Sequence, residues 1–178
     1  MQLFLIRGLV AIAWAAVFAA VSDSPTTGVT VAAGILVVIY PLIDVAASLI
    51  DARSQRGSAR RLLLAGAAVS AVAAAALALA ATGSVADVLA VFGVWALLSG
   101  AAQFFVALRR RARLGTQWPM LLAGVGSVSF GIAYVIASTC TNPMLDMLAI
   151  YGAGGGIDFV VQAWLLAQRR RGLAALPG

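Results

Sequence analysis

Long apolar stretches separated by short polar breaks dominate the chain. The 178-residue sequence contains six such stretches, at approximately residues 3–21, 27–50, 62–82, 85–108, 118–138 and 144–168. A membrane-spanning helix needs about 20 consecutive apolar residues, and each stretch is close to that length. The stretches are rich in Ala and Leu and lack the alternation of apolar and polar positions that strands show. The pattern therefore predicts an all-α membrane protein with six transmembrane helices.

Basic residues are confined to every second break. One arginine opens the first stretch, and the others follow the second, fourth and sixth stretches: Arg7, Arg53, Arg56, Arg60, Arg61, Arg109, Arg110, Arg111, Arg113, Arg169, Arg170 and Arg171. Loops on the cytoplasmic side of a membrane carry the excess of Lys and Arg. We therefore expect both termini and both arginine-rich breaks to face the cytoplasm.

The composition supports a membrane protein and excludes several kinds of chemistry. Hydrophobic residues make up 63% of the chain and charged residues 10%, whereas soluble domains have about 45–50% and 25%. The sequence has no His and one Cys, so the usual nitrogen and sulfur metal sites and Ser-His-Asp triads cannot be built. We expect no catalytic residue, metal or cofactor. The net charge of +6 lies in arginine clusters typical of membrane topology, which argues against a nucleic-acid partner.

Two local features have simple expected explanations. The first apolar stretch could be read as a secretory signal peptide, but one Arg and several apolar residues precede its core, which favours an uncleaved helix. Cys140 has no second cysteine in the chain with which to form a disulfide. We expect an idle thiol there, and an intermolecular disulfide is the alternative.

The apolar stretches also form an internal repeat. The even-numbered stretches align at a spacing of 59 residues and the odd-numbered ones at a spacing of 58. The first alignment superposes Gly34, Gly93 and Gly152, then Asp44, Gln103 and Gln162, and then Tyr40, Ser99 and Asp158. The spacing predicts one domain over residues 1–178, made of repeats at approximately 1–58, 59–116 and 117–178. Each repeat would be a helical hairpin of the same orientation, and three such hairpins in tandem imply a pseudo-threefold axis along the membrane normal.

These features resemble a known family. The three short tandem hairpins, the six stretches in under 200 residues and the Arg-Gly in "IRGLVAIAWAAVFA" at residues 6–19 are similar to the HdeD-type acid-resistance membrane proteins. That family consists of bacterial short-repeat proteins of unknown molecular activity. The resemblance covers nearly the whole chain and implies a multi-pass protein of the bacterial inner membrane linked to acid or general stress. It supplies no catalytic residues.

Arg7 and Asp44 are predicted to form an ion pair inside the membrane. Both lie roughly 10 Å from the cytoplasmic ends of their helices, where an isolated charge costs about 2.5–3.5 kcal/mol to insert. In the other two repeats the arginine is replaced by alanine, and the aspartate becomes Gln103 or Gln162, so both charges disappear together. The pair would either lock the first hairpin or take part in a proton or ion relay.

Asp158 is expected to differ, because the residues that match it in the other repeats, Tyr40 and Ser99, are neutral. It lies roughly 15 Å from the cytoplasmic end of the last helix, a depth at which we expect no basic residue anywhere in the chain. Burial without a cation favours the protonated carboxyl. Gln162 is one turn away and can hydrogen-bond to it. Asp158 would then be either a titratable proton or cation site, or a hydrogen-bonded link between helices through Gln162, Ser99 or Tyr40.

Glycines and aspartates near helix ends complete the candidate features. The sequence "YGAGGG" places Gly152 and Gly156 one turn apart, with Gly154 and Gly155 between them. We expect this segment either to pack closely against another helix or to form a hinge beside Asp158. Acidic residues also stand at the expected start of the fourth and sixth helices, where carboxylates cap free amides, at Asp87 and Asp146.

The functional expectation follows from these features. We expect a non-enzymatic membrane protein with a structural or adaptive role, acting as a monomer or a homo-oligomer within the lipid bilayer. The alternative is a small proton or solute transporter or channel that uses Asp158 and also Asp44. Anionic lipid head groups are the expected partners of the arginine clusters, if these clusters do more than set the topology.

Overall fold

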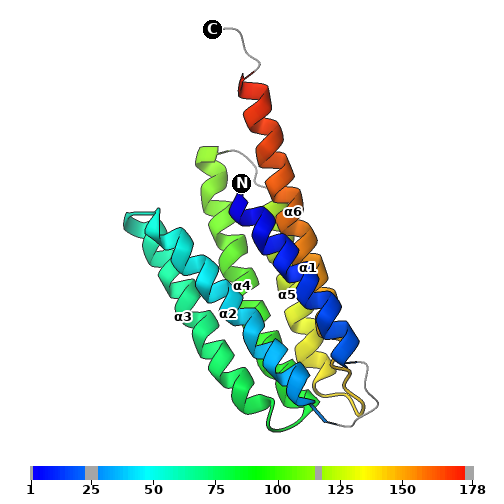
Figure 1. The fold of residues 1–178 in the computed structure, drawn as a ribbon. Helices are drawn as coiled ribbons and strands as arrows, with labels where there is room; N and C mark the ends of the chain where they lie inside the picture. Colours follow the sequence, from blue (N-terminus) through cyan, green and yellow to red (C-terminus); the bar gives the residue numbers. More distant parts are fainter. Residues whose placement is uncertain (1, 23–27, 115–117, 175–178) are drawn as a thin grey trace.

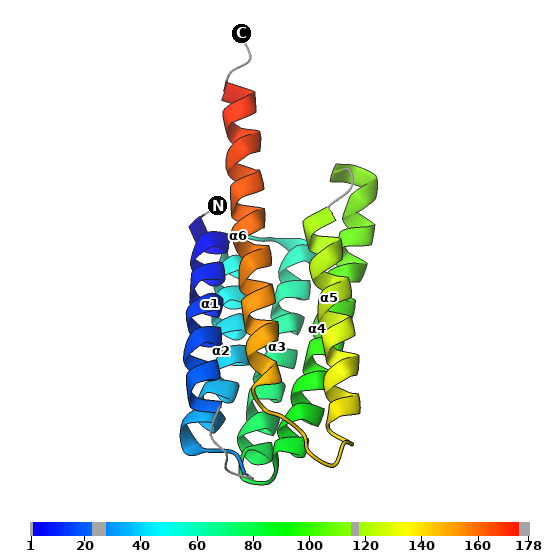
Figure 2. The same cartoon turned by 90° about the vertical axis from the view of Figure 1, so that its right-hand side faces the viewer.

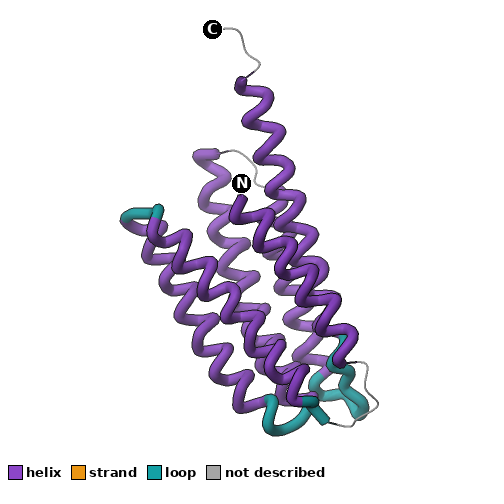
Figure 3. Tube along the Cα trace, viewed as in Figure 1, coloured by secondary structure: helices purple, strands orange, loops and turns teal. Residues whose placement is uncertain are grey.

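The computed structural model describes residues 2–22, 28–114 and 118–174, and this part of the chain is helical with short turns (Figures 1 and 3). Its helices are α1 (Gln2–Ser22), α2 (Val31–Arg53), α3 (Gly57–Ala80), α4 (Val85–Leu114), α5 (Trp118–Ala137) and α6 (Met147–Ala174). All six are long and apolar enough to cross a membrane. The prediction of an all-α protein with six spanning helices is therefore confirmed. The side chains of the arginines at 109–113 and 169–171 lie outside the described residues.

Helix ends differ from the apolar limits where polar residues continue or stop a helix. α3 begins at Gly57 rather than at residue 62, and α4 and α6 continue past residues 108 and 168. Arginine is a good helix former, so a helix need not end where its apolar stretch ends. α2 begins later than residue 27, because the hydroxyl of Thr30 caps it by accepting a 3.2 Å hydrogen bond from the Ala33 amide.

The two acids predicted to cap helices behave differently. Asp87 forms a reciprocal cap with Ser84 at the start of α4: its carboxylate accepts bonds from the Ser84 amide (2.9 Å) and hydroxyl (2.7 Å). Asp146 precedes α6, but its buried Oδ1 has no hydrogen-bond partner among the described residues, so this atom does not form the predicted cap. Backbone bonds to the Leu145 and Asp146 carbonyls begin α6 instead.

The helices run alternately up and down, which gathers chemically similar connections at one end. Figures 1 and 2 show the start of α1, the end of α6 and the α2–α3 turn at the same end of the bundle. The turns that lead from α3 to α4 and from α5 to α6 lie at the opposite end. Arg53, Arg56, Arg60 and Arg61 therefore share an end of the bundle with Arg7.

Helix contacts are most extensive between α4 and α5, between α2 and α3, and between α1 and α6. Each of these pairs joins helices from different expected repeats, whereas the pairs inside a repeat touch less. The contact between the first and last helices brings the two ends of the chain's helical path together (Figure 2). Lipid tails are as apolar as leucine, so such contacts depend on close packing and hydrogen bonds rather than on a hydrophobic driving force.

Glycines permit the closest of these approaches. A Cβ atom added to Gly93 would lie 2.8 Å from the carbonyl oxygen of Gly131, and one added to Gly131 would lie 2.7 Å from that of Gly93. The same holds for Gly100 and Gly124 along the same α4–α5 contact, at 2.8 Å and 3.0 Å. Any side chain at these positions would therefore force the two backbones apart.

Candidate functional site

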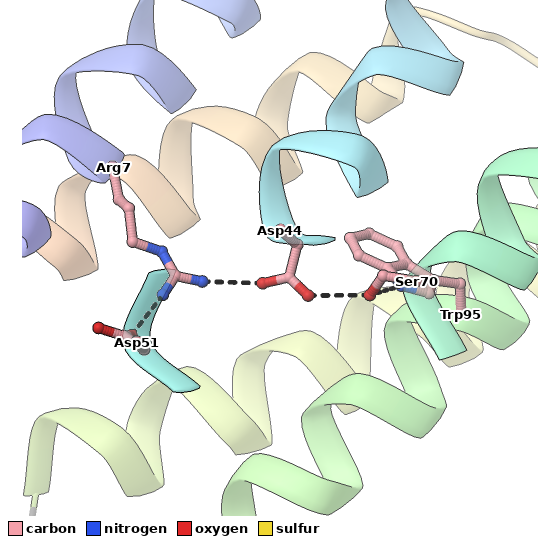
Figure 4. Close-up of polar contacts among 5 residues, drawn as sticks. All are labelled: Arg7, Asp44, Asp51, Ser70 and Trp95. Carbon is pink, nitrogen blue, oxygen red and sulfur yellow. Dashed lines mark hydrogen bonds and ion pairs between the residues drawn. The ribbon is translucent and has the colours of Figure 1, made fainter. Parts of the chain in front are cut away.

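Arg7 of α1 is held by two carboxylates of α2. One guanidinium nitrogen lies 2.8 Å from Oδ1 of Asp44, and the other lies 3.4 Å from Oδ2 of Asp51 (Figure 4). The Arg7 side chain is only 16% exposed. Its guanidinium carbon also lies 4.9 Å from the ring centroid of Phe159 in α6, within the range of a cation–π contact. The structure thus brings together Arg7 and Asp44, as the sequence predicts, and adds a second acid.

The other oxygen of Asp44 is bound as well. Oδ2 accepts a 2.8 Å hydrogen bond from the hydroxyl of Ser70 in α3. The same hydroxyl accepts a 3.0 Å bond from the indole Nε1 of Trp95 in α4. Figure 4 shows these contacts as one continuous chain from Arg7 to Trp95. We call Arg7, Asp44, Asp51, Ser70 and Trp95 the polar network, and it connects α1, α2, α3 and α4.

The buried donors of the polar network find their partners within it. Ser70 is 1% exposed and Trp95 is 5% exposed, so the hydroxyl and the indole N–H would have no water partner without these bonds. A buried donor or acceptor left without a partner costs about 1–3 kcal/mol. The network therefore stabilises the junction of four helices, and its members depend on one another.

Sequence reasoning missed three members of the polar network. Asp51 follows Asp44 by seven residues, two helical turns, so the two acids share a helix face, and this spacing could have identified it. Ser70 lies in a helix of Ala and Leu, and its register against α2 cannot be obtained from a single sequence. Nothing in the sequence around Trp95 indicates that its indole N–H forms a hydrogen bond in addition to the packing of its ring.

Asp158 of α6 is partly buried and accepts a hydrogen bond from the side-chain amide of Gln162, one turn further along. Within the described residues, this amide is its one hydrogen-bond partner. Arg7 lies close to this level, because its guanidinium covers the ring of the neighbouring Phe159. The expectation that no basic residue occurs at this depth is therefore inaccurate. α6 continues beyond residue 168, where its apolar stretch ends. The depth of a residue in the membrane, when counted from the end of the apolar stretch, therefore cannot be compared between α1 and α6. Arg7 nevertheless pairs with the acids of α2 and not with Asp158.

The residues that match Asp158 in the other repeats, Tyr40 and Ser99, do not bond to it in the described part of the chain. Tyr40 of α2 is surrounded by rings: its centroid lies 4.4 Å from that of Trp14, 5.9 Å from that of Trp95 and 5.9 Å from that of Tyr151. Ser99 and Gln103 are partly buried on α4. No hydrogen bond connects any of the three to Asp158 in the part of the chain that the structure describes.

A central aromatic cluster fills the interior beside the polar network. Its rings come from α1, α2, α4, α5 and α6, and most neighbouring pairs meet edge to face or tilted, the arrangements that aromatic quadrupoles favour. Its members are Trp14, Phe18, Tyr40, Phe92, Trp95, Phe130, Tyr134 and Tyr151. Trp95 belongs to both groups, so the rings and the ion pair form one connected interior.

Hydrogen bonds fix the polar atoms of the central aromatic cluster. The Tyr151 hydroxyl lies 2.7 Å from that of Ser127, which donates in turn to the carbonyl of Ala96. The Tyr134 hydroxyl donates to a backbone carbonyl of α6 at 2.9 Å, and the indole of Trp14 donates to one of α2 at 2.7 Å. These bonds join helices that follow one another in the chain: α1 to α2, α4 to α5 and α5 to α6.

The glycines around Asp158 have distinct surroundings. Added Cβ atoms at Gly152 and Gly156 would collide with α1, at 2.7 Å from the ring of Trp14 and 2.8 Å from the carbonyl of Gly8, respectively. A Cβ at Gly155 would lie 3.4 Å from the Tyr40 hydroxyl, and one at Gly154 would meet nothing within 4 Å. The segment is continuous helix, so Gly152 and Gly156 lie in close helix packing and none of the four glycines forms a break. The expectation of close packing is wrong for Gly154, which faces open space, and Gly155 makes only ordinary contact.

The chemical capacity of these groups is narrow. Within the described residues, no group of three or more His, Cys, Asp or Glu side chains could hold a metal ion. The polar network can compensate charge and transmit strain between helices. Asp158 can accept or release a proton, because its partner is neutral.

Comparison with known proteins gives one match. Residues 67–136 match the model of a short repeat of unknown function (DUF308), the family to which HdeD-type proteins belong. The matched segment runs from within α3, through α4, to the last turn of α5, and so crosses the expected boundary between the second and third repeats. No curated protein and no solved structure matches the chain. The resemblance is thus supported for a short-repeat membrane protein over this segment.

Proposed function

We propose that this chain is a non-enzymatic protein of the bacterial inner membrane whose helix bundle has a structural role in adaptation to acid or general stress. One observation supports this proposal above all others: the side chains of the polar network bond to one another and join four helices. Arg7 contacts two carboxylates, and both oxygens of Asp44 are engaged. A network of side chains that bond to one another across four helices makes a bundle rigid, which suits a structural role better than transport through the same groups.

The link to stress rests on the resemblance to the HdeD-type family and on the short-repeat match, which covers residues 67–136. A survival experiment tests it. Cells that lack the chain should survive acid exposure less well than cells that carry it, and Asp158→Asn should restore survival as fully as the wild type. Equal survival with and without the chain would remove the proposed role.

We further propose that the bundle consists of three hairpins around a pseudo-threefold axis, with both termini in the cytoplasm. The three closest helix pairs support this arrangement, because each joins an even helix to the odd helix that follows it, with α6 followed by α1. The contact of Gly93 with Gly131 has a counterpart at Gly152, whose added Cβ would lie 3.3 Å from that of Ala15. Gly152 lies 59 residues after Gly93, which is one repeat, and Ala15 lies 116 residues before Gly131, which is two repeats of 58.

A proton or small-cation pathway is the second candidate function, and one observation favours it. Asp158 is a partly buried carboxyl in a candidate membrane span, and its partner is the neutral Gln162. Intramembrane acids without a cation partner mark proton and ion routes in many transporters. Tyr40 lies near this carboxyl along α6, since its hydroxyl faces Gly155, one turn before Asp158.

A flux assay separates the two candidates. Purified protein in liposomes should give no proton flux above that of empty liposomes if the role is structural. If the chain conducts, Asp158→Asn should abolish the flux. Asp87→Asn is the matched control, because Asp87 is an exposed cap whose amide replacement keeps an acceptor oxygen, and it should leave any flux unchanged. Flux that survives Asp158→Asn would exclude this residue as the conducting group.

A further inference from the structure

The connection between α2 and α3 carries a concentration of arginines that form no ion pair within the described residues. Residues 51–61 contain one acid and four arginines, and the side chains of Arg53, Arg56, Arg60 and Arg61 are exposed. The acid, Asp51, is engaged by Arg7. Among the described residues, no carboxylate lies within ion-pair distance of the four arginines. We call these four residues the arginine corner.

The local structure increases this excess of charge. α3 begins at Gly57, and its first turn contains no acid, so Arg60 and Arg61 follow the positive end of the helix dipole. Arg56 precedes the helix and forms no side-chain cap. Like charges collected in this way repel one another, so an anion brought to this position would be stabilised by several cations at once.

The arginine corner borders directly on exposed apolar surface. Leu49 and Ile50, just before it on α2, are 44% and 49% exposed, and Leu62, just after it on α3, is 54% exposed. Further along α3, Gly66 is exposed, and an added Cβ there would meet nothing within 4 Å. A cationic group at the end of an apolar helix pair matches a molecule with an anionic head and apolar tails.

We propose that the arginine corner is a binding surface for an acidic phospholipid of the surrounding membrane. The lipid phosphate would contact Arg53, Arg60 and Arg61, and its acyl chains would lie along Leu62 and the open surface at Gly66. Arginine suits this role because its planar guanidinium donates two parallel hydrogen bonds to phosphate oxygens. This inference is independent of the proposed function, since it concerns the outer surface of the bundle rather than its interior.

The relative affinity for phosphatidylglycerol over phosphatidylcholine tests the proposal. It can be measured by native mass spectrometry of the full chain released from mixed-lipid micelles. Each arginine near a phosphate should contribute about fivefold to the preference. The wild type should therefore retain phosphatidylglycerol selectively, and R53Q/R56Q/R60Q/R61Q should lose the preference. In the double variant R60Q/R61Q the preference for phosphatidylglycerol should fall by about 25-fold. This variant keeps the test valid if the quadruple variant folds poorly.

The arginines at the end of α4 supply the matched control. R109Q/R110Q/R111Q/R113Q removes the same number of positive charges from that helix end and should keep the preference of the arginine corner. If both quadruple variants lose the preference for phosphatidylglycerol equally, the preference comes from general surface charge and the proposal fails. It also fails if R53Q/R56Q/R60Q/R61Q still selects phosphatidylglycerol. Finally, inorganic phosphate alone should not displace the bound lipid, and displacement at equal concentration would show a free-phosphate site instead.

Discussion

At the scale of single residues, Arg7 shows how a charge is accommodated inside an apolar bundle. Its two acids are similarly exposed, at 36% for the Asp51 side chain and 33% for that of Asp44, but Asp44 is hydrogen-bonded on both oxygens. The 3.4 Å contact to Asp51 is longer than the 2.8 Å contact to Asp44. The shorter contact, which is linked to two further helices, should therefore contribute most of the stability.

Replacing Arg7 alone should be worse than replacing Arg7 and Asp44 together. Arg7→Ala leaves Asp44 and Asp51 without their cation and should lower the free energy of unfolding by about 3–5 kcal/mol, whereas Asp44→Ala leaves Arg7 paired with Asp51 and should cost less. The double variant should lose less than the sum of the two. Unfolding by detergent titration, followed by circular dichroism, measures this coupling.

Gln103 supplies the control for this comparison of single and double variants, because it is the counterpart of Asp44 in the second repeat and carries no charge. Combining Gln103→Ala with Arg7→Ala should give additive losses. Additive losses for Arg7→Ala with Asp44→Ala would contradict the energetic importance of the pair.

Ser70 should be coupled to Trp95 in the same way. Ser70→Ala leaves Oδ2 of Asp44 and Nε1 of Trp95 without their bonds, at a cost of about 1–3 kcal/mol. Trp95→Phe should then cost less in the Ser70→Ala background than in the wild type, because its donor has already lost its partner. Ser129→Ala is the control, since this exposed hydroxyl bonds only to its own helix and should change stability little. Equal costs of Trp95→Phe in both backgrounds would argue against the bond.

The Arg7–Asp44 contact was predictable from the sequence, and the rest of the polar network mostly was not. Repeat alignment revealed the pair because both charges vanish together in the other repeats. The partners of Ser70 and Tyr40 are determined by the register between neighbouring helices. This register depends on side-chain packing across the whole bundle. Asp158 illustrates the limit, because its match to Tyr40 and Ser99 in the repeats does not bring these side chains into hydrogen-bonding contact.

At the scale of helices, the long apolar stretches identified every helix, and polar residues determined where the helices begin and end. The stretch predicted at 85–108 became α4, and the arginines beyond it extended the helix to Leu114. The pairing of helices was less accessible. Glycine spacing indicated close packing on α6, but the sequence did not show that α1, rather than α5, would receive Gly152 and Gly156.

Two glycines only two residues apart should respond oppositely to the same substitution. Gly156→Ala places a Cβ 2.8 Å from the Gly8 carbonyl and should lower the free energy of unfolding by about 1–3 kcal/mol, because α1 must move. Gly154→Ala meets open space and should be neutral or stabilising by up to about 1 kcal/mol through helix propensity. Detergent unfolding of the two variants checks this, and equal effects would contradict the α1–α6 contact.

At the scale of the whole molecule, charge and connectivity give the bundle two unlike ends. One end carries the start of α1, the end of α6 and the arginine corner, and the other carries the exposed thiol of Cys140 (Figure 1). An even number of antiparallel spans necessarily returns the chain to its starting side. What the fold leaves open is which end faces the cytoplasm, and only the arginines decide it.

The positive-inside rule predicts that the arginine end is cytoplasmic. A thiol reagent that cannot cross membranes should therefore label Cys140 in intact cells. In the Cys140→Ser background, a cysteine placed at the exposed Ser58 should react only after the cells are permeabilised. Both positions are exposed, so the difference in labelling reports the side of the membrane rather than burial. If the cysteine at residue 58 is labelled in intact cells and Cys140 of the wild type is not, the arginine corner lies outside and the topology is reversed.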